Sequence, residues 1–228
     1  MVDDVNDEAG TPGDKPVTLE ARSMSQDGRR FSPSSGRNKD AVRDAFLAHM
    51  PDAGTVLEIA SGTGEHGAHI LKQALNLAWQ YSDIDCEGLQ SQNAWAAYLG
   101  DGRLRGALEL DVTTDDWGAA EAAGPYDGLF CANMIHISPI GATRGLFAGA
   151  GRVLRSGGRM MLYGPFSRGG EMVESNQLFD RHLKGIDPAW GVRDLDTDIL
   201  PLAEQAGLRL VQTVAMPSNN LSVFFERG

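Results

Sequence analysis

Short apolar runs alternate with amphipathic stretches along most of the chain. The segment 55–60 (TVLEIA) is nearly continuous in apolar residues, whereas those of 65–75 (EHGAHILKQAL) recur at helical spacing. The pattern predicts strands at 55–60, 77–85, 107–113, within 126–137, and at 159–166, 208–217 and 220–227, and helices at 65–75, 87–99, 115–122, 143–154, 174–184 and 197–205. Such alternation is typical of a mostly parallel sheet with helices on both faces.

The N-terminal part follows a different pattern. Residues 1–21 are polar and rich in Asp, Gly and Pro, which predicts a disordered leader. The next stretch, RRFSPSSGRNKD, is loop-like at first, and helical spacing begins only at about Lys39, in a helix that Pro51 and Gly54 end. No internal change of composition follows, so we expect a single domain over 22–228.

Composition excludes several classes of protein. The 228 residues are 42% hydrophobic, enough to bury a core, and the formal net charge of −11 disfavours a nucleic-acid partner. The two cysteines form neither a disulfide framework nor zinc-site spacing, so we expect free thiols, no metal and a reducing, cytoplasmic location. The polar N-terminus lacks the apolar run of a signal peptide, and no run of about 18 apolar residues predicts a membrane span.

The segment LEIASGTGEHG (57–67) joins the first predicted strand of the sheet to its helix. Gly62 and Gly64 allow positive φ and close approach to a ligand, and the following helix presents free N–H groups. The spacing Gly62-x-Gly64-x-x-Gly67 also fits a dinucleotide fingerprint. Alone, the turn is equally compatible with a tight strand–helix connection that binds nothing.

Three acids at the ends of three successive predicted strands change this interpretation. Glu58 would repel the pyrophosphate of a dinucleotide but attract the sulfonium and ammonium groups of S-adenosylmethionine. Asp83, 21 residues after Gly62, suits ribose hydroxyls in either cofactor, and Asp111 suits an adenine amino group. The alternatives are a helix N-cap for Asp111 and solvated turn acids for the other two.

A short-chain reductase would require a Tyr-x-x-x-Lys pair. None of the four tyrosines has a lysine four places later; the residues found there are Asp85, Gly102, Phe130 and Ser167. This absence further disfavours a dinucleotide-binding oxidoreductase.

With these features the sequence resembles the class I S-adenosylmethionine-dependent methyltransferases, and within them the DUF938 family, which includes the methyltransferase-like 26 proteins. The resemblance runs from about Arg30 to the C-terminus and rests on RFSPSSGRNKD, LEIASGTGEHGAHI, WQYSDID, LDVT, NMIHISP, LYGPF, SNQLFD, DPAWGVRDL and MPSNN. It implies a Rossmann-like α/β fold with a seven-stranded, mostly parallel sheet of order 3-2-1-4-5-7-6 and an antiparallel last strand. One departure from the resemblance is the segment SSGRN, where the family is expected to show a sequence closer to AAERN.

The resemblance and the strand ends together predict the residues of the site. Segment 29–50 is expected to act as a lid, with Arg37 and Asn38 reaching the methionine carboxylate of the cofactor. The predicted cofactor-binding residues are Arg37, Asn38, Glu58, Ala60, Ser61, Gly62, Thr63, Gly64, His66, Asp83, Ile84, Asp111, Val112 and Asn133.

The acceptor is expected beyond the fourth and fifth strands. His136 is a candidate general base, with a packing role as the alternative, and Tyr163 is expected to stack on or hydrogen-bond the acceptor. The predicted acceptor-binding residues are Phe31, His136, Tyr163, Asn176, Arg193 and Asn219. An ion pair or helix cap is the alternative for Arg193, and a turn is the alternative for Asn219.

These expectations converge on a methyltransferase that uses S-adenosylmethionine, releases S-adenosylhomocysteine and acts on a small molecule by in-line displacement. We expect a monomer or homodimer with no nucleic-acid or membrane partner. A dinucleotide-binding oxidoreductase and a non-enzymatic cofactor-binding scaffold remain the alternatives, and the atom that receives the methyl group is open.

Overall fold

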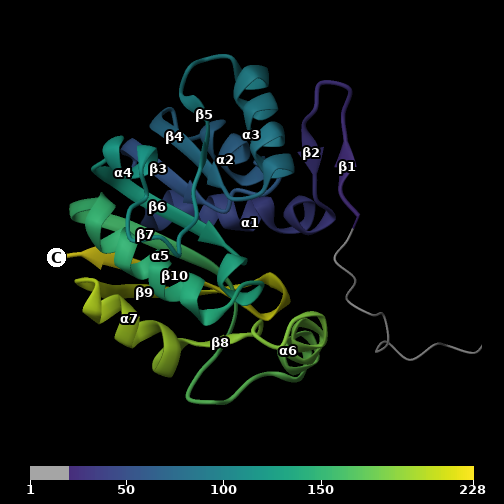
Figure 1. Ribbon diagram of the computed structural model, residues 1–228, viewed down its shortest axis with the longest axis vertical. Helices are drawn as coiled ribbons and strands as arrows, with labels where there is room; N and C mark the ends of the chain where they lie inside the picture. Colours follow the sequence, from purple (N-terminus) through teal and green to yellow (C-terminus); the bar gives the residue numbers. More distant parts are fainter. Residues whose placement is uncertain (1–20) are drawn as a thin grey trace, which may run out of the picture.

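One mixed sheet organises the molecule (Figure 1). The computed structural model describes residues 21–228. The strand order is β5-β4-β3-β6-β7-β10-β9, which is the predicted 3-2-1-4-5-7-6, and β10 is antiparallel to both neighbours as predicted. The strands are β3 (Ala53–Ile59), β4 (Asn76–Asp83), β5 (Leu104–Glu109), β6 (Tyr126–Ala132), β7 (Leu154–Ser167), β9 (Leu208–Met216) and β10 (Asn220–Arg227), and the short β8 (Arg193–Asp194) pairs in parallel with the end of β7.

Helices cover both faces of this sheet, as the alternation predicts. One face packs against α1 (Pro33–His49), α2 (Glu65–Leu71) and α3 (Cys86–Leu99). The other packs against α4 (Ala119–Ala122), α5 (Ile140–Val153) and α7 (Leu200–Gln205), while α6 (Glu174–Ile186) lies near β8 (Figure 1).

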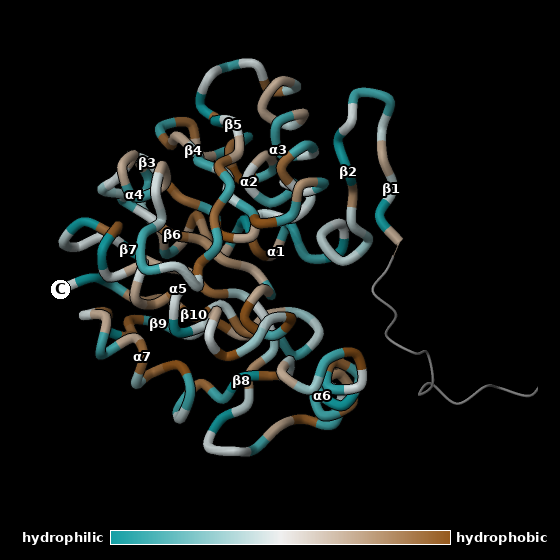
Figure 2. The backbone as a smooth tube through the Cα atoms, viewed as in Figure 1, coloured by the Kyte–Doolittle hydropathy of each residue, from teal (hydrophilic) through white to brown (hydrophobic). Residues whose placement is uncertain are grey.

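Alternate residues of each strand enter the two cores, because successive side chains point to opposite faces. On β7, Met161 and Tyr163 join the α1–α3 core, whereas Met160 and Leu162 join the α5 core. Hydrophobic positions accordingly gather along the sheet in Figure 2. In the part of the chain from Ala21 onward, no helix is both long and apolar enough to cross a membrane.

The N-terminal segment differs from the prediction. A hairpin of β1 (Ser23–Met24) and β2 (Arg30–Phe31) precedes α1, and α1 begins at Pro33 rather than near Lys39. Proline suits the first turn of a helix, because the N–H group that it lacks would have no partner there. Pro33 therefore starts α1, and the polar residues directly after it are helical although they show no apolar periodicity. The predicted leader, 1–21, lies outside the described residues except for Ala21.

Smaller differences affect element ends. Helix α2 ends at Leu71 instead of 75, β5 occupies 104–109 instead of 107–113, and α5 begins at Ile140 instead of 143. Strand β7 begins at Leu154, directly after α5, and includes the Ser-Gly-Gly at 156–158, which a reading of the sequence alone would take as the close of the preceding helix. A five-residue π-helical segment, Leu195–Ile199, precedes α7. Glycine and turn residues mark these boundaries only approximately.

Candidate functional site

The carboxyl ends of the parallel strands meet at one edge of the sheet, where open α/β folds bind ligands. Backbone hydrogen bonds connect the segments that leave these ends. The amide of Ser61 donates to Ser82 O at 2.9 Å, that of Leu110 to Asp83 O at 2.9 Å, and that of Asn133 to Tyr163 O at 2.8 Å. The hairpin and α6 lie toward this edge, and the C-terminus lies on the opposite side (Figure 1).

The glycine turn follows β3 and begins α2. Gly62 (φ 57°) and Gly64 (φ 83°) have left-handed backbones, and Gly64 is the N-cap of α2. A Cβ at Gly64 would lie 3.0 Å from Trp95 Cδ1, so limited space adds to the conformational reason for glycine at this position. Ala60 also has a positive φ, 53°, which is costly for a residue with a Cβ and is typical of functional sites.

Glu58 is buried beneath this turn, with 2% of its surface exposed. Its Oε2 accepts a hydrogen bond from Trp79 Nε1 at 2.7 Å. A Cβ at Gly67 would overlap Trp79 Nε1 and lie 2.8 Å from Glu58 Oε2, so the third glycine makes room for this contact. Burial raises the pKa of Glu58 to about 8, the indole and the Gly67 amide oppose this, and Asp83 adds to it.

Asp83 ends β4 and holds the glycine turn from the other side. Its Oδ2 accepts hydrogen bonds from the Gly62 amide at 2.7 Å and from Gln92 Nε2 at 3.0 Å. Its Oδ1 accepts from the amides of Ile84 and Asp85. Ile84, predicted as a cofactor contact, follows directly and is 62% exposed, a state that leaves its apolar side chain available to a ligand ring.

The third acid is placed differently from the first two. Asp111 Oδ1 accepts hydrogen bonds from the Thr113 amide at 2.8 Å and the Thr113 hydroxyl at 2.7 Å. This is a local turn and not the helix N-cap considered as the alternative, since the next helix is capped by Gly118. Val112 is buried in the core against α5. A Cβ at Gly145 of α5 would overlap Val112 O, so the helix packs directly on this turn.

Four polar side chains from distant parts of the chain meet near the end of β7. His66 Nε2 and Asn38 Oδ1 are 2.9 Å apart, and Asn38 also hydrogen-bonds the Tyr163 hydroxyl. Asn220 Nδ2 donates to the same hydroxyl at 3.1 Å. Burial raises the pKa of Tyr163, and burial, with His69 and Lys39, lowers that of His66 to about 4, so this cluster is uncharged at neutral pH.

His136 does not join this cluster. Its side chain is 1% exposed, packs edge-on against Phe166, and accepts a 3.4 Å hydrogen bond from the Arg193 amide. A Cβ at Gly164 would lie 2.5 Å from its Nε2. Burial, followed by the charge of Arg193, lowers its pKa to about 3. These contacts favour the packing role over the base role, because such a ring binds a proton poorly at neutral pH.

Arg193 is occupied by backbone. Its guanidinium donates to the carbonyls of Ile135 at 2.9 Å, Ser138 at 2.6 Å and Ala189 at 3.0 Å. It therefore binds two loops together rather than pointing at an acceptor, and neither predicted alternative, an ion pair or a helix cap, describes it.

The remaining predicted residues are spread around the edge. Asn176 Nδ2 donates to Asn219 O at 3.0 Å, so α6 and the turn before β10 hold each other. Asn133 has a left-handed backbone directly after β6. Arg37 is exposed on the first turns of α1, and Phe31 packs edge-on against Trp95 at a ring separation of 5.4 Å.

Several residues that hold the site were not predicted. Tyr81 hydrogen-bonds both Gly64 O and the Ala68 amide, Gln92 donates to Gly62 O, and Ser91 donates to Thr63 O. A signal existed in the sequence, since Ser91 and Gln92 interrupt the buried face of a predicted helix with polar groups. Across residues 21–228 no cluster of His, Cys, Asp and Glu is arranged to hold a metal ion.

Solved structures with the same fold include several methyltransferases. The O-methyltransferase family 2 protein from Planctomyces limnophilus, in complex with apigenin, has a TM-score of 0.70 at 17% identity over 86% of this chain and 58% of its own. The mitomycin 7-O-methyltransferase MmcR has 0.71 at 14% over 86% and 55%. The calicheamicin-biosynthesis methyltransferase CalO1, in its SAH-bound form, has 0.64 at 18% over 83% and 54%.

The fold is thus the Rossmann-like fold of these solved methyltransferases. The chain belongs to the family described as "Protein of unknown function (DUF938)", whose model matches residues 29–227. It spans less than two thirds of the solved methyltransferases named above.

Proposed function

We propose that this protein is an S-adenosylmethionine-dependent methyltransferase acting on a small-molecule acceptor. The observation that carries the proposal is the pair of carboxyl groups, Glu58 and Asp83, on adjacent strand ends beside the glycine turn. In the described part of the chain, no cation is among the groups that shift the pKa of Glu58. Glu58 is protonated at neutral pH in the absence of a ligand, so it is the Asp83 carboxylate that would repel a pyrophosphate. A sulfonium or ammonium group would be attracted to Asp83 and would in addition favour the ionised form of Glu58.

The fit of the cofactor extends along the edge. Asp83 would hold the ribose hydroxyls, Ile84 would cover the adenine ring, and the Asp111–Val112 turn would face the adenine amino group. Asn38, together with Arg37, would reach the methionine carboxylate from α1, within the proposed lid of residues 29–50. When bound, the cofactor supplies a methyl group attached to a sulfonium, and the neutral thioether that remains after transfer is an excellent leaving group.

The chain's own residues then align the acceptor and exclude water. We assign the alignment of the acceptor to Tyr163, because its hydroxyl is held by Asn38 and Asn220 at the end of β7. We assign His136 a packing role and no proton transfer. With His66 and Tyr163 both neutral, the site suits an acceptor that is already nucleophilic at neutral pH.

A labelling experiment tests this activity. The protein is incubated with methyl-labelled S-adenosylmethionine and a small-molecule extract, and the products are separated by mass. We expect label in a small-molecule product with the wild type and with an Asp101→Ala control, whose site is the exposed loop beside Arg103, but not with Asp83→Ala. Label confined to the cofactor in every sample, despite measurable binding, would support a non-enzymatic scaffold.

A further inference from the structure

The N-terminal hairpin reaches the glycine turn through Ser91 of α3. The side chain of Ser91 is fully buried, with 0% exposure. Its Oγ accepts a hydrogen bond from the Arg30 amide at 2.8 Å and donates one to Thr63 O at 2.7 Å. A single hydroxyl therefore joins β2 to the residue between the two glycines; its bond to Thr63 is buried and its bond to Arg30 is partly buried.

Glu65 makes a second connection to the same residue. It is 4% exposed, and its Oε2 accepts from the Ser32 amide at 2.6 Å and from the Thr63 hydroxyl at 3.2 Å. Lys39 Nζ lies 3.9 Å from its Oε1. The carbonyl and the hydroxyl of Thr63 are thus each bonded to a side chain that also holds the hairpin or its junction with α1.

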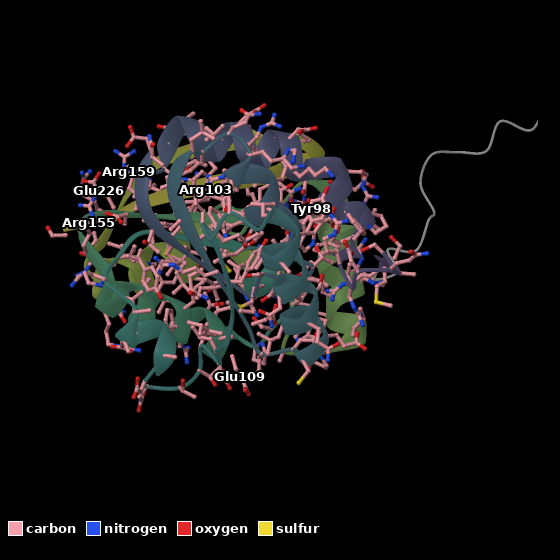
Figure 3. All side chains as sticks on the ribbon, turned by 90° about the horizontal axis from the view of Figure 1, so that it is seen from above. Tyr98, Arg103, Glu109, Arg155, Arg159 and Glu226 are labelled. Carbon is pink, nitrogen blue, oxygen red and sulfur yellow. The ribbon has the colours of Figure 1, made fainter. Side chains whose placement is uncertain are left out.

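Aromatic side chains of α3 also hold the hairpin close to the glycine turn. The Arg29 guanidinium lies 3.4 Å from the ring centre of Tyr98 and 4.7 Å from that of Trp95, an arrangement that favours a cation–π interaction. Phe31 packs on Trp95, and Trp95 in turn contacts Gly64. Tyr98 lies well apart from the charged group formed by Arg155, Arg159 and Glu226, as Figure 3 shows.

We propose that Ser91 and Glu65 are positioning residues that make the shape of the glycine turn depend on the docking of the N-terminal hairpin. When the hairpin leaves, Ser91 loses the Arg30 amide and Glu65 loses the Ser32 amide at the junction with α1, so Thr63 loses its fixed position. Because coupling between two sites is reciprocal, a ligand that fixes the turn also stabilises the docked hairpin. The identity of that ligand, an S-adenosyl cofactor, rests on the proposed function; the coupling itself does not.

Hydrogen exchange without any ligand tests the coupling. Arg29→Ala, which loosens the hairpin from outside the turn, is expected to speed exchange at 22–32 and also at the amides of 61–66. Arg155→Ala, at the distant charged group, serves as the control and leaves both segments unchanged. Faster exchange in the hairpin with unchanged exchange at 61–66 would overturn the proposal.

Binding measurements provide the second test. S-adenosylhomocysteine is expected to slow exchange of 22–32 in the wild type, and Ser91→Ala and Glu65→Ala are each expected to weaken its binding about tenfold. Glu65→Gln, which keeps an acceptor oxygen, is expected to restore much of that loss. Wild-type affinity in both alanine variants would overturn the proposal, whereas failure of the wild type to bind would contradict the proposed function and leave the exchange test to judge the coupling.

Discussion

The indole N–H of Trp79 donates to the buried carboxyl of Glu58 at 2.7 Å, directly over the position of Gly67. Because a Cβ at Gly67 would overlap the indole nitrogen, the third glycine of the Gly62-x-Gly64-x-x-Gly67 spacing serves a carboxyl group and not a phosphate. The glycine spacing of a dinucleotide fingerprint is therefore present here for a different reason, the packing of Trp79 against Glu58. The relationship between these two side chains leads to the first two predictions.

Gly67→Ala should lower the free energy of unfolding by about 1–3 kcal/mol, the usual cost of overpacking a core. The added methyl group would displace Trp79 Nε1 and Glu58 Oε2, which are held together in the interior. Gly141→Ala is a matched control in α5, where a Cβ meets nothing within 4 Å, and should stabilise by about 0.5–1 kcal/mol. Urea denaturation of both variants checks the pair; equal effects would contradict the close packing.

The pH dependence of stability should reveal the protonated carboxyl of Glu58. Its pKa is raised from 4.5 to about 8 in the folded state, so the folded protein holds a proton that the unfolded chain releases. Stability from this group is full below pH 4.5 and is lost as pH rises to about 8, with a slope of at most about 1.4 kcal/mol per pH unit. Glu58→Gln should lack this slope, and the difference in unfolding free energy between it and the wild type, measured from pH 5 to 9, checks this. Parallel curves would show that Glu58 is ionised throughout.

Ala60 carries a left-handed backbone at the start of the turn, which costs about 1–2 kcal/mol for a residue with a Cβ. Ala60→Gly should relieve that strain, partly offset by the greater entropy of glycine in the unfolded chain, and leave the protein as stable as the wild type or up to about 1 kcal/mol more stable. Ala60→Val should be less stable, since a β-branched residue tolerates positive φ poorly. Thermal unfolding of the two variants decides; stabilisation by valine would refute the strain.

Arg193 should matter for stability and not for cofactor binding. Its fork of N–H groups donates to three carbonyl oxygens, a geometry that lysine cannot reproduce. Arg193→Lys should cost about 1–3 kcal/mol of unfolding free energy, because the partly buried carbonyls of Ile135 and Ser138 lose their donors. Affinity for S-adenosylhomocysteine, measured below the unfolding transition, should stay within about twofold of the wild type. A large loss of affinity with normal stability would contradict this purely structural role and make Arg193 a cofactor contact.

Much of the fold could be predicted because its signals are local. Apolar runs located the seven principal strands, and the resemblance supplied their order. The start of α1 could not be predicted in this way, because Pro33 and its polar successors have no apolar periodicity. The two-residue strands of the hairpin are too short to form a pattern.

The site was predictable in part for the same reason. Strand ends located Glu58 and Asp83, since the sequence shows where each apolar run stops. It does not show that Trp79 crosses to Glu58, that the Arg193 fork reaches three carbonyls, or that Ser91 joins the hairpin to Thr63. These are contacts between segments far apart in the chain, and only the packed structure brings them together.

The most direct test of the account is a calorimetric titration of the protein with S-adenosylhomocysteine and, separately, with NAD. We predict one binding site for S-adenosylhomocysteine, loss of binding by about 100-fold or more in Asp83→Ala, and no heat of binding with NAD. Binding of NAD in the absence of any binding of S-adenosylhomocysteine would contradict the claim that the carboxyl groups of Glu58 and Asp83 select a positively charged cofactor.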